Sequence, residues 1–249
     1  MTIADIYAGY LGGKYIETWK SISSMHYNDL KKDEQIIVNK IVYDTLKKIG
    51  YNVNIVMNVL NQNGFEHKNF GNINTLNRTY LLRNPNKYND LILELIGDTE
   101  NRGKVPFFFA SFCSFFEVID FRGSFKDIEV DILLDALFIE SPNNLQELEE
   151  RIFDITSDEK SVSACMFSPD QFVKENVSGD IGPCVLLDNN VLIDNSVVNF
   201  SEDMPMLFVE YLRFCFEWAC FPNLFWATEK EKEPFLSILK EVKENIKPF

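Results

Sequence analysis

The run of residues 105–119 constrains the fold more than any other part of the chain, because it is apolar on almost every side. Pro106 suits the first turn of a helix, where the amide hydrogen that proline lacks would have no partner within the helix. Six phenylalanines follow between residues 107 and 116. A helix that is apolar nearly all round is surrounded by protein, so the run predicts a central core helix that ends at Ile119. Its polar residues, spaced by three, are Ser111, Ser114 and Glu117.

Residues 206–221 predict a second core helix of the same kind. Its charged residues, Glu210, Arg213 and Glu217, recur at helical spacing and form one narrow stripe, within which neighbours are at ion-pair spacing. The helix should stop at Pro222, because proline cannot continue a helix. We expect the two helices to bury a shared set of large residues, in mutual contact or through common neighbours: Phe108, Phe112, Phe116, Leu212, Phe216 and Trp218.

The first hundred residues have the apolar periodicity of helices, with glycines as helix ends. The helices expected are 33–50, closed by Gly50, 53–60, which ends at Gly64, and 88–96, which ends at Gly97. Residues 68–87 are polar apart from the short anchor 80–82, and they include Pro85. This segment is therefore the best candidate for a linker.

The second half predicts shorter elements, several of them strands. Residues 127–132 alternate strictly between carboxylates and branched apolar residues, which is typical of a strand with one buried face. The other elements expected are a buried strand or turn at 134–140, a helix at 145–152, a strand at 162–167, a hairpin of 185–187 with 191–193, and an amphipathic helix at 229–246. The sequence thus predicts an α+β fold, in which an N-terminal helical layer and a mainly antiparallel sheet pack against the aromatic-rich helices.

Charge is the strongest functional signal in the sequence. The chain has 24 basic and 38 acidic residues, a net charge of −14, and residues 127–217 alone contain 20 acidic residues against four basic ones. This balance excludes a generic nucleic-acid binder and argues against binding to an anionic membrane surface, because both need a basic surface. We expect an acidic face that binds a basic protein partner. Its candidate residues are Asp127, Glu129, Asp131, Asp180, Glu202 and Asp203.

Catalytic constellations are missing from the sequence. The two histidines, His26 and His67, lie in polar contexts, and neither a nucleophile elbow nor zinc-ligand spacing nor a phosphate loop is present. Residues 127–131 offer three carboxylates to a divalent cation, but the solvated outer face of a strand is the favoured interpretation. Residues 168–171 form a capping box that opens a short helix. We therefore expect no catalytic residues, no metal and no cofactor.

The chain has no features of an exported or membrane protein. Its N-terminus lacks a basic region followed by an apolar stretch, and its apolar runs are far shorter than the ~20 residues of a membrane span. The five cysteines are odd in number and widely spread. They are expected to be mostly buried thiols in a reducing cytoplasm.

Three segments occur in a characteristic order. They are a Gly-Lys-Val-Pro segment before the first aromatic helix, residues 168–179 (SPDQFVKENVSG), and residues 208–222, which end in Phe-Pro. Together they resemble a group of bacterial proteins that is in turn similar to the SUKH superfamily. The matching residues are Gly103, Pro106, Ser168, Pro169, Asp170, Lys174, Asn176, Ser178, Gly179, Tyr211, Leu212, Arg213, Trp218, Phe221 and Pro222. All of them look like fold determinants.

Three departures from the family pattern stand out. Val105 replaces a leucine, Asp180 replaces a glycine, and Ala219-Cys220 replaces Gly-Gly before the final Phe-Pro. The last departure puts an identical turn at the helix end in question, because alanine and cysteine tolerate positive φ poorly.

The resemblance implies a small twisted sheet packed on the Pro106 helix, within an α+β domain over residues 85–249. Residues 1–84 would then be a helical region packed on that domain, as part of one compact unit. Members of the superfamily are mostly immunity proteins against bacterial toxins, so we expect a non-enzymatic cytoplasmic binding protein that neutralises a toxin. The alternatives are a carboxylate-based hydrolase or metal-dependent enzyme, and a regulatory scaffold. A deep pocket with raised carboxyl pKa values would favour the enzyme, and a shallow acidic face would favour binding.

Overall fold

The computed structural model describes residues 2–67, 80–82, 88–95, 103–126, 136–156, 161–166, 183–199 and 202–249. Its α-helices are α1 (Ile3–Leu11), α2 (Tyr15–Ile22), α3 (Lys32–Gln62), α4 (Tyr88–Leu95), α5 (Phe107–Phe115), α6 (Leu145–Glu150), α7 (Phe208–Glu217), α8 (Glu229–Lys232) and α9 (Leu236–Asn245), and its short 3₁₀ helices include η5 (Pro222–Phe225) and η6 (Glu233–Phe235). Its strands are β1 (Phe65–His67), β2 (Tyr80–Leu82), β3 (Phe116–Asp120), β4 (Gly123–Phe125), β5 (Phe138–Glu140), β6 (Ile152–Thr156), β7 (Ser161–Met166), β8 (Cys184–Leu186), β9 (Ser196–Asn199) and β10 (Glu202–Leu207).

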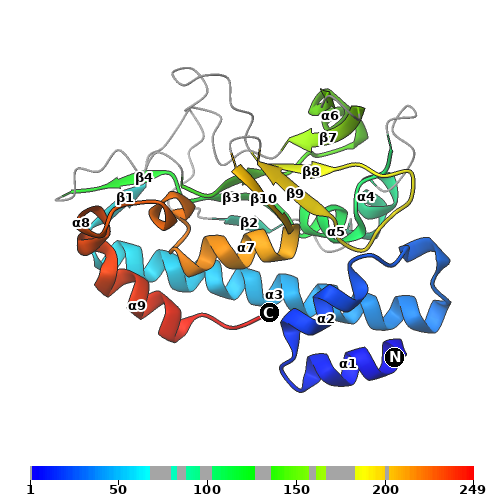
Figure 1. Cartoon of the computed structure of the whole chain (residues 1–249), viewed down its shortest axis with the longest axis horizontal. Helices are drawn as coiled ribbons and strands as arrows, with labels where there is room; N and C mark the ends of the chain where they lie inside the picture. The colour runs from blue at the N-terminus through cyan, green and yellow to red at the C-terminus, as the bar shows by residue number, and fades with distance from the viewer. Residues whose placement is uncertain are drawn as a thin grey trace.

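The sheets and the largest group of helices occupy different sides of an α+β fold. Helices α1, α2, α3 and α9 lie together on one side, the strands lie on the other, and α5 and α7 run between them (Figure 1). Within the described residues every strand pairing is antiparallel, in sheets of order β10-β9-β8-β7-β6, β2-β3-β5 and β1-β4. The predicted fold class is therefore confirmed. Strands β1 and β2, from the first third of the chain, pair with β4 and β3 respectively.

The prediction of two helices at 33–50 and 53–60 is wrong, because α3 is one continuous helix of 31 residues. Gly50 lies in its interior and is buried against the ring of Phe116. A glycine costs a helix interior about 1 kcal/mol relative to alanine. Residues on both sides of Gly50, including Leu46 and Val53, are fully buried. Packing of this continuous apolar face outweighs the local cost of one glycine.

The first aromatic helix is shorter than predicted. Pro106 is the N-cap residue of α5, as its sequence position indicates, but the helix ends at Phe115 and residues 116–120 form β3. β3 pairs with β2 on one side and β5 on the other, so its main-chain groups have sheet partners instead of helical ones. Strand pairing from distant segments therefore overrides the local apolar pattern. Ser111 and Ser114, the expected polar stripe, are both buried.

The predicted hairpin of 185–187 with 191–193 is also wrong. β8 pairs with β7 and β9, and residues 187–195 connect β8 to β9. The carbonyls of Leu192 and Ile193 each accept a hydrogen bond of 2.8 Å from the first amides of α5, at Phe107 and Phe108. This loop therefore provides hydrogen-bond acceptors for the first amides of the central helix α5. In contrast, the structure confirms the helix at 88–96 within its described residues and a strand within 134–140, at 138–140. The helix predicted at 145–152 ends at Glu150, because Ile152 begins β6, and the strand predicted at 162–167 is β7, at 161–166.

The second aromatic helix begins and ends inside its predicted bounds of 206–221. β10 extends to Leu207, and α7 stops at Glu217. The chain then turns with φ 52° at Ala219 and φ 65° at Cys220, two buried residues that are not glycine. The single helix expected at 229–246 is instead divided into α8, η6 and α9, with Pro234 within η6.

The predicted core set is largely confirmed. Phe108, Phe112, Phe116, Leu212 and Phe216 are each at most 1% exposed, whereas Trp218 is half-buried. The ring of Phe208, on α7, lies 5.6 Å from that of Phe108 and 5.2 Å from that of Phe112, between ring centroids. The two aromatic helices therefore share one core. The five cysteines are buried as expected. Among the described residues, no helix is both long and apolar enough to cross a membrane.

Candidate interaction surface

Carboxylates gather around α6, at the edge of the five-stranded sheet formed by β6. The helix begins because the side chain of Asn144 accepts a hydrogen bond of 2.9 Å from the amide of Glu147. Leu148 is the buried residue that anchors the helix on the protein. Four further carboxylates of this region are exposed or half-buried: Glu140, Glu149, Glu150 and Asp154. We call these four residues, from β5, α6 and β6, the acidic edge.

One guanidinium group lies among these carboxylates. Arg151 donates from Nη1 to the main-chain oxygen of Glu140 at 2.5 Å, and its Nη2 lies 4.0 Å from Oε2 of the same residue. Asp154 accepts a hydrogen bond of 2.7 Å from the hydroxyl of Ser163 on β7. One arginine cannot neutralise four carboxylates, so the acidic edge has a net negative charge.

Most of the acidic face predicted from sequence lies outside the described residues. This holds for Asp127, Glu129, Asp131 and Asp180, and for the strand predicted at 127–132. Glu202 and Asp203 begin β10, where Glu202 pairs with Asn199 of β9, and their side chains are outside the description. β10 and β6 are opposite edges of the same sheet. The acidic edge around α6 is thus separate from the two predicted residues that the structure places.

Asp194 is the described carboxyl group with the most altered protonation. It is 2% exposed, and burial raises its pKa from 3.8 to about 7, although main-chain hydrogen bonds partly oppose that rise. Its Oδ1 accepts from the amide of Asn195 at 2.9 Å, and its Oδ2 accepts from the amide of Val209 at 3.0 Å. Both oxygens therefore bind main chain, and the residue positions the first turn of α7. The 14-residue separation from that helix hides this cap from a local sequence pattern.

The motif residues that the structure describes have structural roles. Gly103 has φ +105°, and a Cβ there would lie 3.1 Å from the main-chain N and O of Asp188. Pro106 caps α5, and Tyr211, Leu212, Phe221 and Pro222 are buried. Trp218 follows the last residue of α7. The loop motif, with Ser168, Pro169, Asp170, Lys174, Asn176, Ser178 and Gly179, lies outside the described residues.

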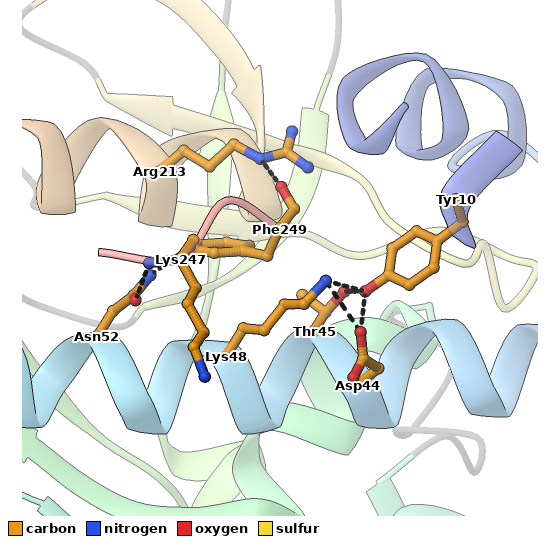
Figure 2. A network of polar contacts seen from close by, with 8 residues as sticks. All are labelled: Tyr10, Asp44, Thr45, Lys48, Asn52, Arg213, Lys247 and Phe249. Atoms are coloured by element: carbon orange, nitrogen blue, oxygen red, sulfur yellow. Dashed lines mark hydrogen bonds and ion pairs between the residues drawn. The ribbon is translucent and has the colours of Figure 1, made fainter. Parts of the chain in front are cut away.

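Polar contacts along α3 attach both ends of the described chain to the helical layer (Figure 2). The hydroxyl of Tyr10 donates to Asp44 at 2.9 Å, and Lys48 forms an ion pair of 3.0 Å with the same carboxylate. Further along α3, the side-chain amide of Asn52 exchanges hydrogen bonds of 2.8 and 2.7 Å with the main chain of Lys247.

Arg213, one of the motif residues, contributes to the attachment of the segment that follows α9. Its Nε donates to the main-chain oxygen of Phe249, whose ring is buried near Phe216 (Figure 2). Arg213 therefore connects α7 with the last described residues, and its role in the described contacts is structural.

A partly exposed group of aromatic residues was not predicted from the sequence. It consists of Phe214, Trp218, Phe225 and Trp226, which we call the aromatic cluster. The centroid of the Phe225 ring lies 5.0–5.7 Å from the centroids of the other three rings. Phe225 is 41% exposed and Trp226 is 46% exposed. The available signal was Pro222, because a proline there prevents the next aromatic pair from continuing the helix and joining its buried face.

The described residues contain no group of three or more histidine, cysteine, aspartate or glutamate side chains that could hold a metal ion. What they do present is two kinds of surface suited to binding a macromolecule, the acidic edge and the aromatic cluster. Comparison of the chain with protein-family models, with curated proteins and with solved structures gives no match.

Proposed function

We propose that this chain is a non-enzymatic binding protein that neutralises a basic protein, in the manner of a toxin-immunity protein. The observation that carries the proposal is the concentration of charge, with 20 acidic residues against four basic ones between residues 127 and 217. The resemblance of its three sequence segments to the SUKH superfamily supports the same function.

The acidic edge suits this role physically. Its four carboxylates are exposed or half-buried, and they come from the successive elements β5, α6 and β6. Exposed charges attract an oppositely charged protein over a Debye length, about 8 Å at physiological ionic strength. Such charges mainly raise the association rate and select the partner, whereas a few buried anchors set the lifetime of the complex.

The direct test starts from the neighbouring open reading frame: if it encodes a large secreted protein, the C-terminal domain of that protein is used in a pull-down with this chain. The complex should form at low ionic strength and weaken at about 1 M salt, where the Debye length falls to about 3 Å. Co-expression of the chain should also restore the growth of cells that produce the toxin domain. Failure to retain the domain, combined with turnover of a small-molecule substrate by the purified chain, would replace this proposal with the enzyme alternative.

A further inference from the structure

The aromatic cluster already binds a cation of its own chain. The ammonium nitrogen of Lys232, on α8, lies 5.5 Å from the centroid of the Trp218 ring. The negative face of an aromatic ring attracts a cation at this range. Lys232 is also within 3.6 Å of Glu229, so ring and carboxylate bind the same ammonium group.

Two other rings of the aromatic cluster remain accessible for a cation from outside. Phe225 and Trp226 are 41% and 46% exposed and lie edge to face, with centroids 5.0 Å apart. Exposed aromatic residues that lie together are typical of protein-binding surfaces, where tryptophan is among the most frequent energetic anchors.

Carboxylates adjoin these rings in the sequence and are open to solvent. Glu217 directly precedes Trp218 and is exposed, and Glu229 follows Trp226 by three residues with 92% of its side chain exposed. An aromatic face combined with a carboxylate suits arginine better than lysine. The planar guanidinium group stacks on rings, donates two parallel hydrogen bonds to a carboxylate, and is more weakly hydrated than an ammonium group.

We propose that the aromatic cluster, together with Glu217 and Glu229, receives an arginine side chain of the basic partner. The proposal rests on the proposed function, because it assigns a contact point for the same partner and adds arginine as the residue recognised. The acidic edge would attract the partner, and the aromatic cluster would fix its position through stacking.

The test measures binding of two synthetic peptides, deca-arginine and deca-lysine, by isothermal titration calorimetry. The two peptides carry the same charge, so the acidic protein attracts them equally. A difference between their affinities therefore reports recognition of the guanidinium group. We expect the native chain to bind deca-arginine about fivefold more tightly than deca-lysine. Trp226→Ala should abolish that preference and leave the affinity for deca-lysine within about twofold. Trp226→Phe should retain part of the preference, since a phenyl ring still offers a face to the cation.

The matched control is Ile36→Ala, which truncates a side chain that is 55% exposed on α3. It should leave both affinities unchanged, and thermal unfolding should show that all three variants are folded. A Trp226→Ala variant that keeps its preference for deca-arginine would overturn the arginine site, while salt-sensitive binding of both peptides would leave the proposed function standing.

Two other outcomes discriminate further. If Trp226→Ala converts a dimer of the native chain into a monomer in sedimentation and leaves peptide binding unchanged, the cluster binds a second copy and the arginine site is wrong. If the native chain binds neither peptide at low ionic strength, the acidic surface does not attract basic chains, and the proposed function itself fails.

Discussion

Asp194 accepts a hydrogen bond of 3.0 Å from the amide of Val209, and so joins the loop before β9 to the first turn of α7. The contact is buried, and it lies beside the core residue Phe208. A buried carboxyl group links the stability of this junction to pH.

Stability should fall as pH rises from about 4 to about 7. The pKa of Asp194 is about 7 in the folded chain against an ordinary value of 3.8, so the folded state binds the proton more tightly. Below pH 4 Asp194 is protonated in both the folded and the unfolded chain, so its ionisation costs no stability. Between pH 4 and 7 the free-energy cost of ionising the buried carboxyl group grows, and above pH 7 it stays constant, on the order of 4 kcal/mol. Urea unfolding at pH 5 and pH 8 should show the native chain losing more stability than Asp194→Asn. Equal losses in both proteins would contradict the assignment to Asp194.

Truncation of Asn52 should destabilise the chain. Asn52→Ala leaves the amide and carbonyl of Lys247 without their side-chain partner, at a cost of about 2–3 kcal/mol. The control is Asn54→Ala on the exposed side of the same helix, with an effect within about 0.5 kcal/mol. Chemical denaturation followed by circular dichroism measures both. A loss as small as that of the control would show that the contact contributes little.

Two glycines should respond in opposite directions to alanine. Gly50→Ala should stabilise the chain by about 0.5–1 kcal/mol, because α3 is continuous there and the new Cβ would lie 3.7 Å from the Phe116 ring, an ordinary contact. Gly103→Ala should destabilise it by about 2 kcal/mol, because φ is +105° and Asp188 is only 3.1 Å away. The melting temperature should rise in Gly50→Ala and fall in Gly103→Ala. Shifts of the same sign would contradict the local geometry at one of them.

Truncation in the shared aromatic core should be more costly. Phe112 is fully buried, with ring centroids 4.9 Å from Phe116 and 5.2 Å from Phe208. Phe112→Ala should cost about 3–5 kcal/mol. The comparison is Phe225→Ala, which removes an exposed ring and should cost far less. Equal losses in equilibrium unfolding would place Phe112 outside the core.

Charge reversal at the acidic edge should slow capture of the basic partner. Glu149→Lys with Glu150→Lys should lower the association rate at low ionic strength and affect dissociation little, because exposed charges act mainly on the approach. Glu241→Lys with Glu244→Lys makes the same change in net charge on α9. Stopped-flow or surface-binding kinetics compare the pairs. An identical slowing by both would mean that net charge alone, and not the acidic edge, governs the encounter.

Local periodicity predicted much of the fold correctly. The apolar runs located α5, α7 and their shared core, because burial of large side chains is a property that a short window reveals. The end of α5 at Phe115 was missed because β3 gains partners from residues 80–82 and 138–140, which no local pattern shows. Gly50 was taken for a helix end for the same reason, since its packing against Phe116 is a tertiary contact.

The candidate surface was less predictable than the core. Net charge indicates an acidic protein, but it does not say which carboxylates share a face: Glu202 and Asp154 lie on opposite edge strands of one sheet. Exposure of Trp226 depends on how the chain turns after Glu217, through positive φ at Ala219 and Cys220. Neither residue type favours that conformation, so the two residues themselves do not indicate the turn, and only Pro222 and the Gly-Gly of the related family pattern pointed to one.

The bonds between Asn52 and Lys247 join positions 195 residues apart, which sets an order of events during synthesis. At about 5–20 residues per second, a ribosome takes roughly 10–40 s to advance from one to the other. For that interval the nascent chain contains the α3 segment without the partner that its buried amide requires. The two hydrogen bonds at the middle of α3 can therefore form only after the last residues of the described chain have left the ribosome.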